Sequence, residues 1–266
     1  RIEAVNPRLN AVVHLAARVH VMKDSVSNPF DEYRKVNIMG SERLAQSAAG
    51  CGVKRFVFMS SVKVNGEENV RAYNEDDAPF PKDSYGISKM IAENRLCEIA
   101  SKTGMELVIL RPPLVYGSGV KANFLNLIKT VHKRRPLPLS KVYNRRSFIY
   151  IENLVDAVIT CIKHPGAAGQ TYFVSDDEDI STPDLIRKIA SALNTSPRIF
   201  PFPRVLLFTL GKLIGKGSSV ERLIGSLTVD ISKIKQELGW KPTVTMDRGL
   251  QKTAEWYFNV YGEKKK

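Results

Sequence analysis

The chain of 266 residues has few cysteines and no long apolar run, and both absences limit what it can be. Its three cysteines, Cys51, Cys97 and Cys161, lie far apart and show no paired metal spacing. We therefore expect free thiols in a reducing, cytoplasmic compartment. No apolar stretch reaches the roughly 18 residues that a membrane-spanning helix needs, so we expect no stable membrane anchor.

Acidic residues are scarce relative to basic ones, which leaves a formal net charge of +13. The lysines and arginines are spread along the chain, and no helix-turn-helix, zinc-finger or RNP pattern occurs, so nucleic acid is not the expected partner. The charge fits an anionic substrate such as a nucleotide diphosphate, or an acidic membrane surface. A solvated basic surface with a basic tail is the simpler interpretation.

The first half of the chain alternates between strand and helix patterns. Apolar strand patterns cover residues 9–17, 55–61 and 105–111, and helix patterns cover residues 29–50 and 84–103. Such alternation is typical of βαβ units, in which a parallel sheet is covered by helices on its faces. The sequence therefore predicts an α/β fold of the doubly wound, Rossmann type.

Beyond about Tyr116 the alternation becomes irregular. Helix patterns occur at residues 124–133, 152–164, 232–238 and 246–257, and one begins at Ser181; short strands are expected at 147–151 and 171–174. The apolar and basic stretch 203–217 predicts an amphipathic helix that closes the second domain, with a helix on a membrane surface as the alternative. We expect a cofactor-binding domain over 1–116 with returning segments from about 140–175, interleaved with a mainly substrate-binding α/β domain over 117–266.

Tyr85 and Lys89 stand out in the stretch Asp83-Ser-Tyr-Gly-Ile-Ser-Lys-Met-Ile-Ala-Glu93. Residues four apart on a helix share one face, and the lysine ammonium favours the phenolate, so we expect Lys89 to lower the pKa of Tyr85 toward neutrality. A phenol of that kind is a general acid/base for an alcohol proton. With nine tyrosines in the chain, about one such spacing arises by chance. The residues around the pair therefore decide whether it indicates a functional site.

Several other motifs follow the predicted strands. His14-Leu-Ala-Ala17 ends the first, Met59-Ser-Ser61 ends the second, and Leu110-Arg-Pro-Pro-Leu-Val-Tyr-Gly117 ends the third. The carboxyl ends of parallel strands share one edge of the sheet, where ligands bind in open α/β folds. We expect these segments to meet the start of the Tyr85 helix at that edge.

This pattern resembles the extended short-chain dehydrogenase/reductases, in particular the NAD-dependent epimerases and dehydratases of nucleotide sugars near UDP-glucose 4-epimerase. The resemblance covers nearly the whole chain. It rests on Val13-His-Leu-Ala-Ala17, Asn37-Ile-Met-Gly40, Ser60-Ser-Val-Lys-Val-Asn-Gly66, Arg146-Ser-Phe-Ile-Tyr-Ile-Glu-Asn-Leu154 and Leu238-Gly-Trp-Lys-Pro242.

The resemblance implies roles for individual residues. Tyr85 is the implied acid/base, Lys89 holds the nicotinamide ribose and tunes Tyr85, and Ser61 hydrogen-bonds the reacting sugar oxygen. The implied cofactor site adds Leu15, Ala16, Ala17, Asn37, Met59, Ser60, Pro112 and Pro113. The implied substrate site consists of Lys63, Leu114, Asn123, Arg146 and Arg222, where the two arginines suit a diphosphate.

One element of the family pattern is absent from the sequence. The family opens with a glycine-rich turn that binds the cofactor pyrophosphate at a helix N-terminus, and no such turn occurs here. We expect an N-terminally incomplete protein that lacks roughly 50 to 60 residues, about one βαβαβ unit. The residue that selects NAD or NADP would lie in that unit, so NAD is expected and NADP stays possible.

The motifs also bear on the reaction. The family's dehydratases carry Thr-Asp-Glu where this chain has Ser61-Val62-Lys63, which disfavours elimination of water. A UDP-sugar 4-epimerase is expected first. A reductase of UDP-4-keto-6-deoxy-N-acetyl-hexosamines and a non-catalytic fragment or binding protein are the alternatives. The resemblance also implies a homodimer, paired through a four-helix bundle of residues 29–49 and 84–103.

Overall fold

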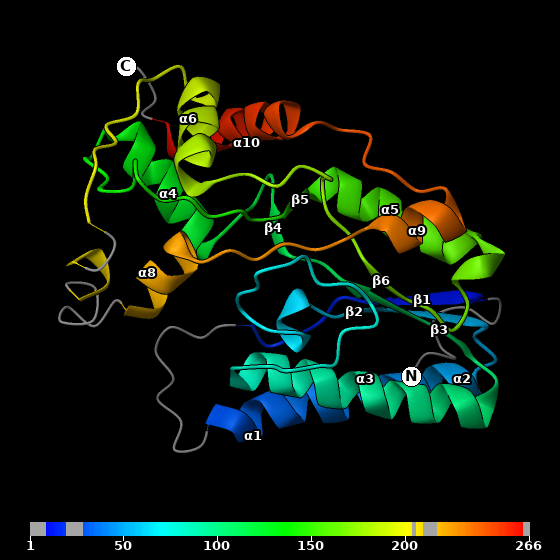
Figure 1. The fold of residues 1–266 in the computed structure, drawn as a ribbon. Coiled ribbons are helices and arrows are strands. Elements are labelled where there is room, and N and C mark those ends of the chain that lie inside the picture. The colour runs from blue at the N-terminus through cyan, green and yellow to red at the C-terminus, as the bar shows by residue number, and fades with distance from the viewer. Residues whose placement is uncertain (1–8, 20–28, 204–205, 210–216, 263–266) are drawn as a thin grey trace.

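A four-stranded parallel sheet forms the centre of the computed structural model, which describes residues 9–19, 29–203, 206–209 and 217–262 (Figure 1). The strand order is β1 (Ala11–His14), β2 (Arg55–Met59), β3 (Glu106–Arg111) and β6 (Thr171–Phe173). All three pairings are parallel. Phenylalanine, valine and leucine dominate the central strands, as expected for strands that are buried on both faces. The predicted parallel α/β sheet is therefore confirmed.

Helices cover both faces of this sheet (Figure 1). One face carries α1 (Pro29–Tyr33), the π-helix η2 (Arg34–Met39), α2 (Gly40–Gly50) and α3 (Ser84–Thr103). The other carries α5 (Ile151–Lys163) and α9 (Ser232–Leu238), with the short 3₁₀ helix η4 (Pro165–Ala167) nearby. Each face has its own apolar cluster, which contains Phe56 and Leu96 on the α3 side and Tyr172 and Trp240 on the α5 side.

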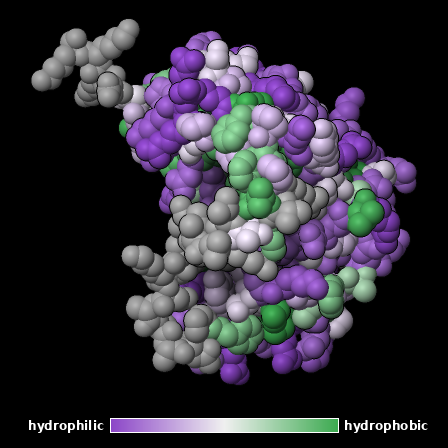
Figure 2. Space-filling model, turned by 60° about the vertical axis from the view of Figure 1, so that its left-hand side comes forward, coloured by the Kyte–Doolittle hydropathy of each residue, from purple (hydrophilic) through white to green (hydrophobic). Residues whose placement is uncertain are grey.

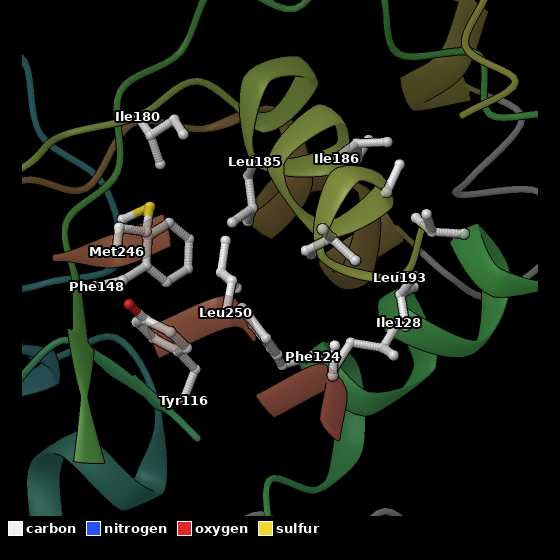
Figure 3. Close-up of a cluster of buried hydrophobic side chains, with 14 of the residues drawn as sticks. Tyr116, Phe124, Ile128, Phe148, Ile180, Leu185, Ile186, Leu193, Met246 and Leu250 are labelled. Atoms are coloured by element: carbon white, nitrogen blue, oxygen red, sulfur yellow. The ribbon is translucent and has the colours of Figure 1, made fainter. Parts of the chain in front are cut away.

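A third apolar cluster lies in the later part of the chain. It joins α4 (Ala122–His132), α6 (Thr182–Ala192), α8 (Gly217–Ile224) and α10 (Met246–Tyr261) beside a second, two-stranded sheet. Figure 3 shows Phe124 and Ile128 from α4, Leu185 and Ile186 from α6, and Leu250 from α10 pointing toward one another. The helix α6 begins after Ser181, whose hydroxyl accepts a hydrogen bond from the Asp184 amide.

Two local features differ from the sequence prediction. β4 (Leu114–Tyr116) is an additional short strand that follows the two prolines and pairs with β5 (Phe148–Tyr150). The predicted helix over 29–50 forms, but its middle turn is a π-helix, a rare form that is frequent at functional sites. The predicted amphipathic helix at 203–217 falls largely outside the described residues. No helix in the described part is long and apolar enough to cross a membrane.

Candidate functional site

The carboxyl ends of β1, β2 and β3 meet at one edge, as the sequence predicts. The strand register pairs His14 with Phe58 and Met59 with Leu110. The segments that follow, 15–17, 60–61 and 112–113, therefore leave the sheet side by side. Pro112 and Pro113 are buried, whereas Leu15 keeps 63% of its surface exposed. An exposed leucine at this edge offers an apolar wall for a flat ring.

Tyr85 is brought to this edge by the first turn of α3. The Asp83 carboxylate caps the helix by accepting a hydrogen bond from the Gly86 amide at 2.8 Å. Gly86 allows the turn to approach the loop after β2 closely, because a Cβ there would lie 2.6 Å from the Lys63 carbonyl oxygen. The Tyr85 side chain consequently reaches Ser61 and hydrogen-bonds with it.

The pKa of Tyr85 moves in the direction opposite to our expectation. Burial, and next the Asp83 carboxylate, raise the pKa of the phenol to about 12, and the hydrogen bond with Ser61 lowers it only in part. The predicted depression by Lys89 is therefore wrong for these residues taken alone. The phenol is protonated near neutral pH unless another positive charge enters the site.

Lys89 lies beneath the same edge, with 1% of its surface exposed. Its ammonium donates a hydrogen bond to the Met59 carbonyl at 2.7 Å and sits 4.3 Å from the centre of the Phe58 ring. Burial lowers the pKa of Lys89 to about 8, while the Glu93 carboxylate opposes this change. Within the described residues, the other two N–H groups of the ammonium have no recorded acceptor.

A buried ion pair holds Lys89 and Ser61 in place. Arg111 at the end of β3 donates two hydrogen bonds to the Glu93 carboxylate, at 3.0 and 2.5 Å. Ser60, next to Ser61, donates to the same carboxylate, and Arg111 also donates to the Asn65 amide oxygen at 3.2 Å. One carboxylate thereby joins α3, β2 and β3. The sequence analysis missed Glu93 and Arg111; the signal was Glu93 four residues after Lys89, on the same helix face.

A second polar network fixes the segment after β1. Asn37, in the π-helix, accepts a hydrogen bond from the Arg18 amide at 2.7 Å and donates one to the Arg18 carbonyl at 3.0 Å. It also donates to the Ser88 hydroxyl, and Ser88 donates to the Tyr85 carbonyl. Asn37 was predicted to bind cofactor directly; its recorded partners are instead protein groups that position the segment after Leu15-Ala16-Ala17.

A cavity of about 770 Å³ opens beside this site. Its walls come from the loop after Ser61 and from α8; they include Gly66, Glu67, Glu68, Tyr73, Phe80, Lys82, Phe208, Glu221, Ile224 and Gly225. The volume lies within the usual range for ligand pockets. Figure 2 shows the molecule hollowed between an upper and a lower lobe on this side. The sequence analysis did not identify this acidic and aromatic lining.

Of the five substrate residues predicted from the sequence, Lys63 and Arg146 contact residues of the cavity wall. Lys63 does not point at it as a free cation, because its ammonium pairs with Glu67 at 2.6 Å and with Asp83. The Arg146 guanidinium donates to the carbonyl of the wall residue Gly225 at 3.0 Å. Leu114 is 36% exposed on β4, and Asn123 is exposed in the first turn of α4. The side chain of Arg222 lies outside the described residues.

The described residues contain no group of His, Cys, Asp and Glu that could hold a metal ion. The chemistry of the edge is instead that of a proton carrier, Tyr85, hydrogen-bonded to a hydroxyl and backed by a buried ammonium. Such a set can hold an alcohol oxygen and take or return its proton.

Comparison with protein families gives a match over residues 2–175 to the "NAD dependent epimerase/dehydratase family". The chain is 47% identical over 252 residues to a UDP-glucose 4-epimerase of Vibrio cholerae, covering 94% of this chain and 77% of that protein. It is 28% identical over 263 residues to the N-acetyl-alpha-D-glucosaminyl-diphospho-ditrans,octacis-undecaprenol 4-epimerase of Escherichia coli O157:H7, covering 94% and 78%.

Solved structures with the same fold include UDP-glucuronic acid 4-epimerase from Bacillus cereus in complex with NAD. That likeness has a TM-score of 0.79 at 24% identity and covers 98% of this chain and 77% of that one. UDP-glucose 4-epimerase from Thermotoga maritima with UDP-glucose has a TM-score of 0.76 at 23% identity, covering 97% and 80%. At these identities the likeness shows the fold.

The buried His14 makes stability depend on pH. Ser41 donates its hydroxyl proton to the Asn37 carbonyl at 2.6 Å, so His14 donates from Nε2 to the Ser41 oxygen at 2.8 Å. Burial and the nearby Lys89 charge lower the pKa of His14 to about 4.

Between pH 6.5 and about 4 the unfolded chain therefore binds a proton that the folded chain does not, and stability falls as pH falls through this window. We expect the free energy of unfolding, measured by urea titration, to fall more steeply there in the wild type than in His14→Gln. The half-buried His164 is not a suitable control position because its ring accepts a hydrogen bond from the Gly166 amide, so the reference is the wild type at pH 7. Equal slopes for the two proteins would contradict this assignment.

Glu93→Gln tests the ion pair. The loss of the anion leaves Arg111 buried without its partner and should lower the free energy of unfolding by about 3–5 kcal/mol. It should also lower the pKa of Lys89 below about 8, so the alkaline limb of the pH–rate profile should move to lower pH. Glu98→Gln, an exposed change on the same helix, is the matched control. An unmoved alkaline limb would show that Glu93 does not tune Lys89.

Proposed function

Because the chain belongs to the NAD-dependent epimerase/dehydratase family, we propose that it inverts C4 of a UDP-hexose, as a nucleotide-sugar 4-epimerase that uses NAD. The observation that carries this proposal is the hydrogen-bonded pair Tyr85 and Ser61 above the buried Lys89, in a chain 47% identical to a UDP-glucose 4-epimerase. UDP-glucose and UDP-N-acetylglucosamine are the substrates we propose to test first.

The residues at the strand edge fit a nicotinamide cofactor. Two N–H groups of the Lys89 ammonium have no recorded acceptor among the described residues and suit the two hydroxyls of a ribose, and Leu15 with Ala16 offers an exposed apolar wall. The proposed cofactor site is completed by Ala17, Met59, Ser60, Pro112 and Pro113. These residues would hold NAD, and the chemistry supplied there would be reversible acceptance of a hydride from C4 of the sugar.

The chain's own residues would handle the proton. Ser61 would hold the C4 oxygen, and Tyr85 would take its proton and later return it. At a pKa of about 12 the phenol is a poor base near neutrality, so the site depends on additional positive charge. An oxidised, cationic nicotinamide would supply that charge, which would couple proton removal to the oxidation state of the cofactor.

The cavity beside the edge would hold the rest of the substrate. We propose that Arg146, beside Gly225 in the cavity wall, contacts the diphosphate, together with Arg222 and Asn123. Leu114 and Lys63 would line the sugar end. The ion pairs of Lys63 with Glu67 and Asp83 imply that it orders the loop more than it binds phosphate.

We also propose a homodimer in the cytoplasm. The cysteines in the described structure are free, which suits a reducing compartment. The helices α2 and α3 pack together on one sheet face, and Val36 on η2 is 41% exposed nearby (Figure 1). Together with the same helices of a second copy they would form a four-helix bundle.

Tyr85→Phe tests the catalytic assignment in the natural polypeptide that contains this chain. It removes only the phenol oxygen, so kcat of the protein for interconversion of UDP-glucose and UDP-galactose should fall by about 10²–10⁴-fold. Tyr143→Phe, at an exposed tyrosine, should leave kcat unchanged. Unchanged turnover in Tyr85→Phe would exclude the proposed role. Net consumption of added NADH with a 4-keto sugar would instead indicate a reductase.

Sedimentation velocity tests the dimer. A charge at Val36 would be buried in the proposed bundle, so Val36→Glu should convert a dimer into a monomer. Val70→Glu, at a fully exposed valine outside these helices, should leave the dimer intact. A wild-type monomer, or a dimer that tolerates Val36→Glu, would contradict the proposed interface.

A further inference from the structure

Lysines and arginines occur throughout the chain, but two segments lack acidic residues and therefore carry its excess positive charge. Residues 107–151 contain nine lysines and arginines, residues 185–220 contain six, and neither segment contains an aspartate or glutamate. The remaining 185 residues carry 25 basic and 27 acidic side chains and are almost neutral. A uniformly solvated basic surface would not divide the charge in this way.

The two segments lie against each other. The Leu137 amide donates to the Arg198 carbonyl at 2.8 Å, and the Phe200 amide donates to the Leu137 carbonyl at 3.0 Å. The Ser140 amide adds a third bond, to the Phe200 carbonyl at 3.2 Å. In Figure 1 this contact lies beyond the end of α4, on the side of the molecule away from the four-stranded sheet.

The cations at this contact face solvent. The exposed cations here are Lys133, Arg134, Arg135, Lys141 and Arg198. No ion pair is recorded between any of them and a carboxylate of the described chain. A helix C-terminus favours cations, which accounts for those directly after α4. The helix C-terminus does not account for Lys141 and Arg198, which belong to the loops.

Apolar side chains accompany these cations. Tyr143 keeps 90% of its surface exposed and Phe200 keeps 41%, and the Phe200 ring packs edge-on against Phe202. Leu206 is exposed as well. In Figure 2 the upper lobe is largely hydrophilic, and a strip of apolar residues interrupts it. We call Lys133, Arg134, Arg135, Lys141 and Arg198, with Tyr143 and Phe200, the basic face.

We propose that the basic face binds the surface of an anionic phospholipid membrane. Several exposed cations next to exposed aromatic and aliphatic side chains are what a peripheral membrane site requires, because the cations attract lipid headgroups while the apolar groups enter the interface. The chain carries no helix-turn-helix, zinc-finger or RNP pattern, so a lipid surface fits these cations better than nucleic acid. The binding is reversible and independent of the sugar reaction.

Vesicle sedimentation tests this proposal with the natural polypeptide. The wild type should sediment with vesicles of equal parts phosphatidylcholine and phosphatidylglycerol, should stay in the supernatant with phosphatidylcholine alone, and should be released by salt. The triple variant Lys133→Gln/Arg135→Gln/Lys141→Gln should bind the anionic vesicles on the order of 100-fold more weakly. Its circular dichroism and thermal midpoint should match those of the wild type.

A second triple variant removes the same charge elsewhere. Lys54→Gln/Lys102→Gln/Lys241→Gln changes three exposed lysines outside both acid-free segments and should retain most of the vesicle binding. Equal losses in the two triple variants would show that net charge alone acts and would overturn the proposal. Absence of wild-type binding to anionic vesicles, or tighter binding to polyuridylic acid than to vesicles, would also overturn it. Weaker binding of Tyr143→Ala than of the wild type to anionic vesicles at low salt would support the apolar part of the basic face.

Discussion

The site depends on one buried ion pair, between Glu93 on α3 and Arg111 at the end of β3. A buried carboxylate without a partner is costly, so the two residues must stay together whenever the chain is folded. Their contact fixes α3 against the sheet edge and also fixes Ser60, which donates to the same carboxylate. Ser61 and Lys89 are neighbours of these residues in the chain, so one interaction sets the positions of the hydroxyl and the ammonium that accompany Tyr85.

The electrostatics of the edge follow from burial. Burial favours the neutral form of every ionisable group, and it raises the pKa of Tyr85 to about 12 while lowering those of Lys89 and His14. The protein residues alone therefore keep the phenol protonated. A site of this kind is inactive as a base until a further positive charge arrives, which suits chemistry in which a cationic ring is the oxidant.

Much of this fold could be predicted from sequence, because its strong signals are local. Buried strands such as 55–59 are apolar and β-branched or aromatic, and α3 carries both a capping aspartate and a terminating glycine, Gly104. The contact between Ser61 and Tyr85 could also be predicted from the sequence, because parallel strands end at one edge of the sheet. The strand β4 could not be predicted, because three residues after two prolines give no periodic signal.

The features missed by the sequence analysis depend on distant contacts. Glu93 and Arg111 look like ordinary charges until the sheet places them together, and Lys63 resembles a substrate ligand until its two acidic partners are seen. The pKa of Tyr85 was predicted from spacing alone, which contains no information on desolvation. The division of charge between segments is visible in the sequence, but its meaning required the contact between Leu137 and Arg198.

The central claim is that a hydride leaves C4 of the sugar and returns to the same carbon while Tyr85 moves the proton. The most direct measurement follows deuterium placed at C4 of UDP-galactose during conversion by the natural polypeptide. The account predicts that the deuterium is retained at C4 of the UDP-glucose formed, with no net change in NADH absorbance. Loss of the deuterium to solvent, or its accumulation on the cofactor in proportion to product, would contradict it.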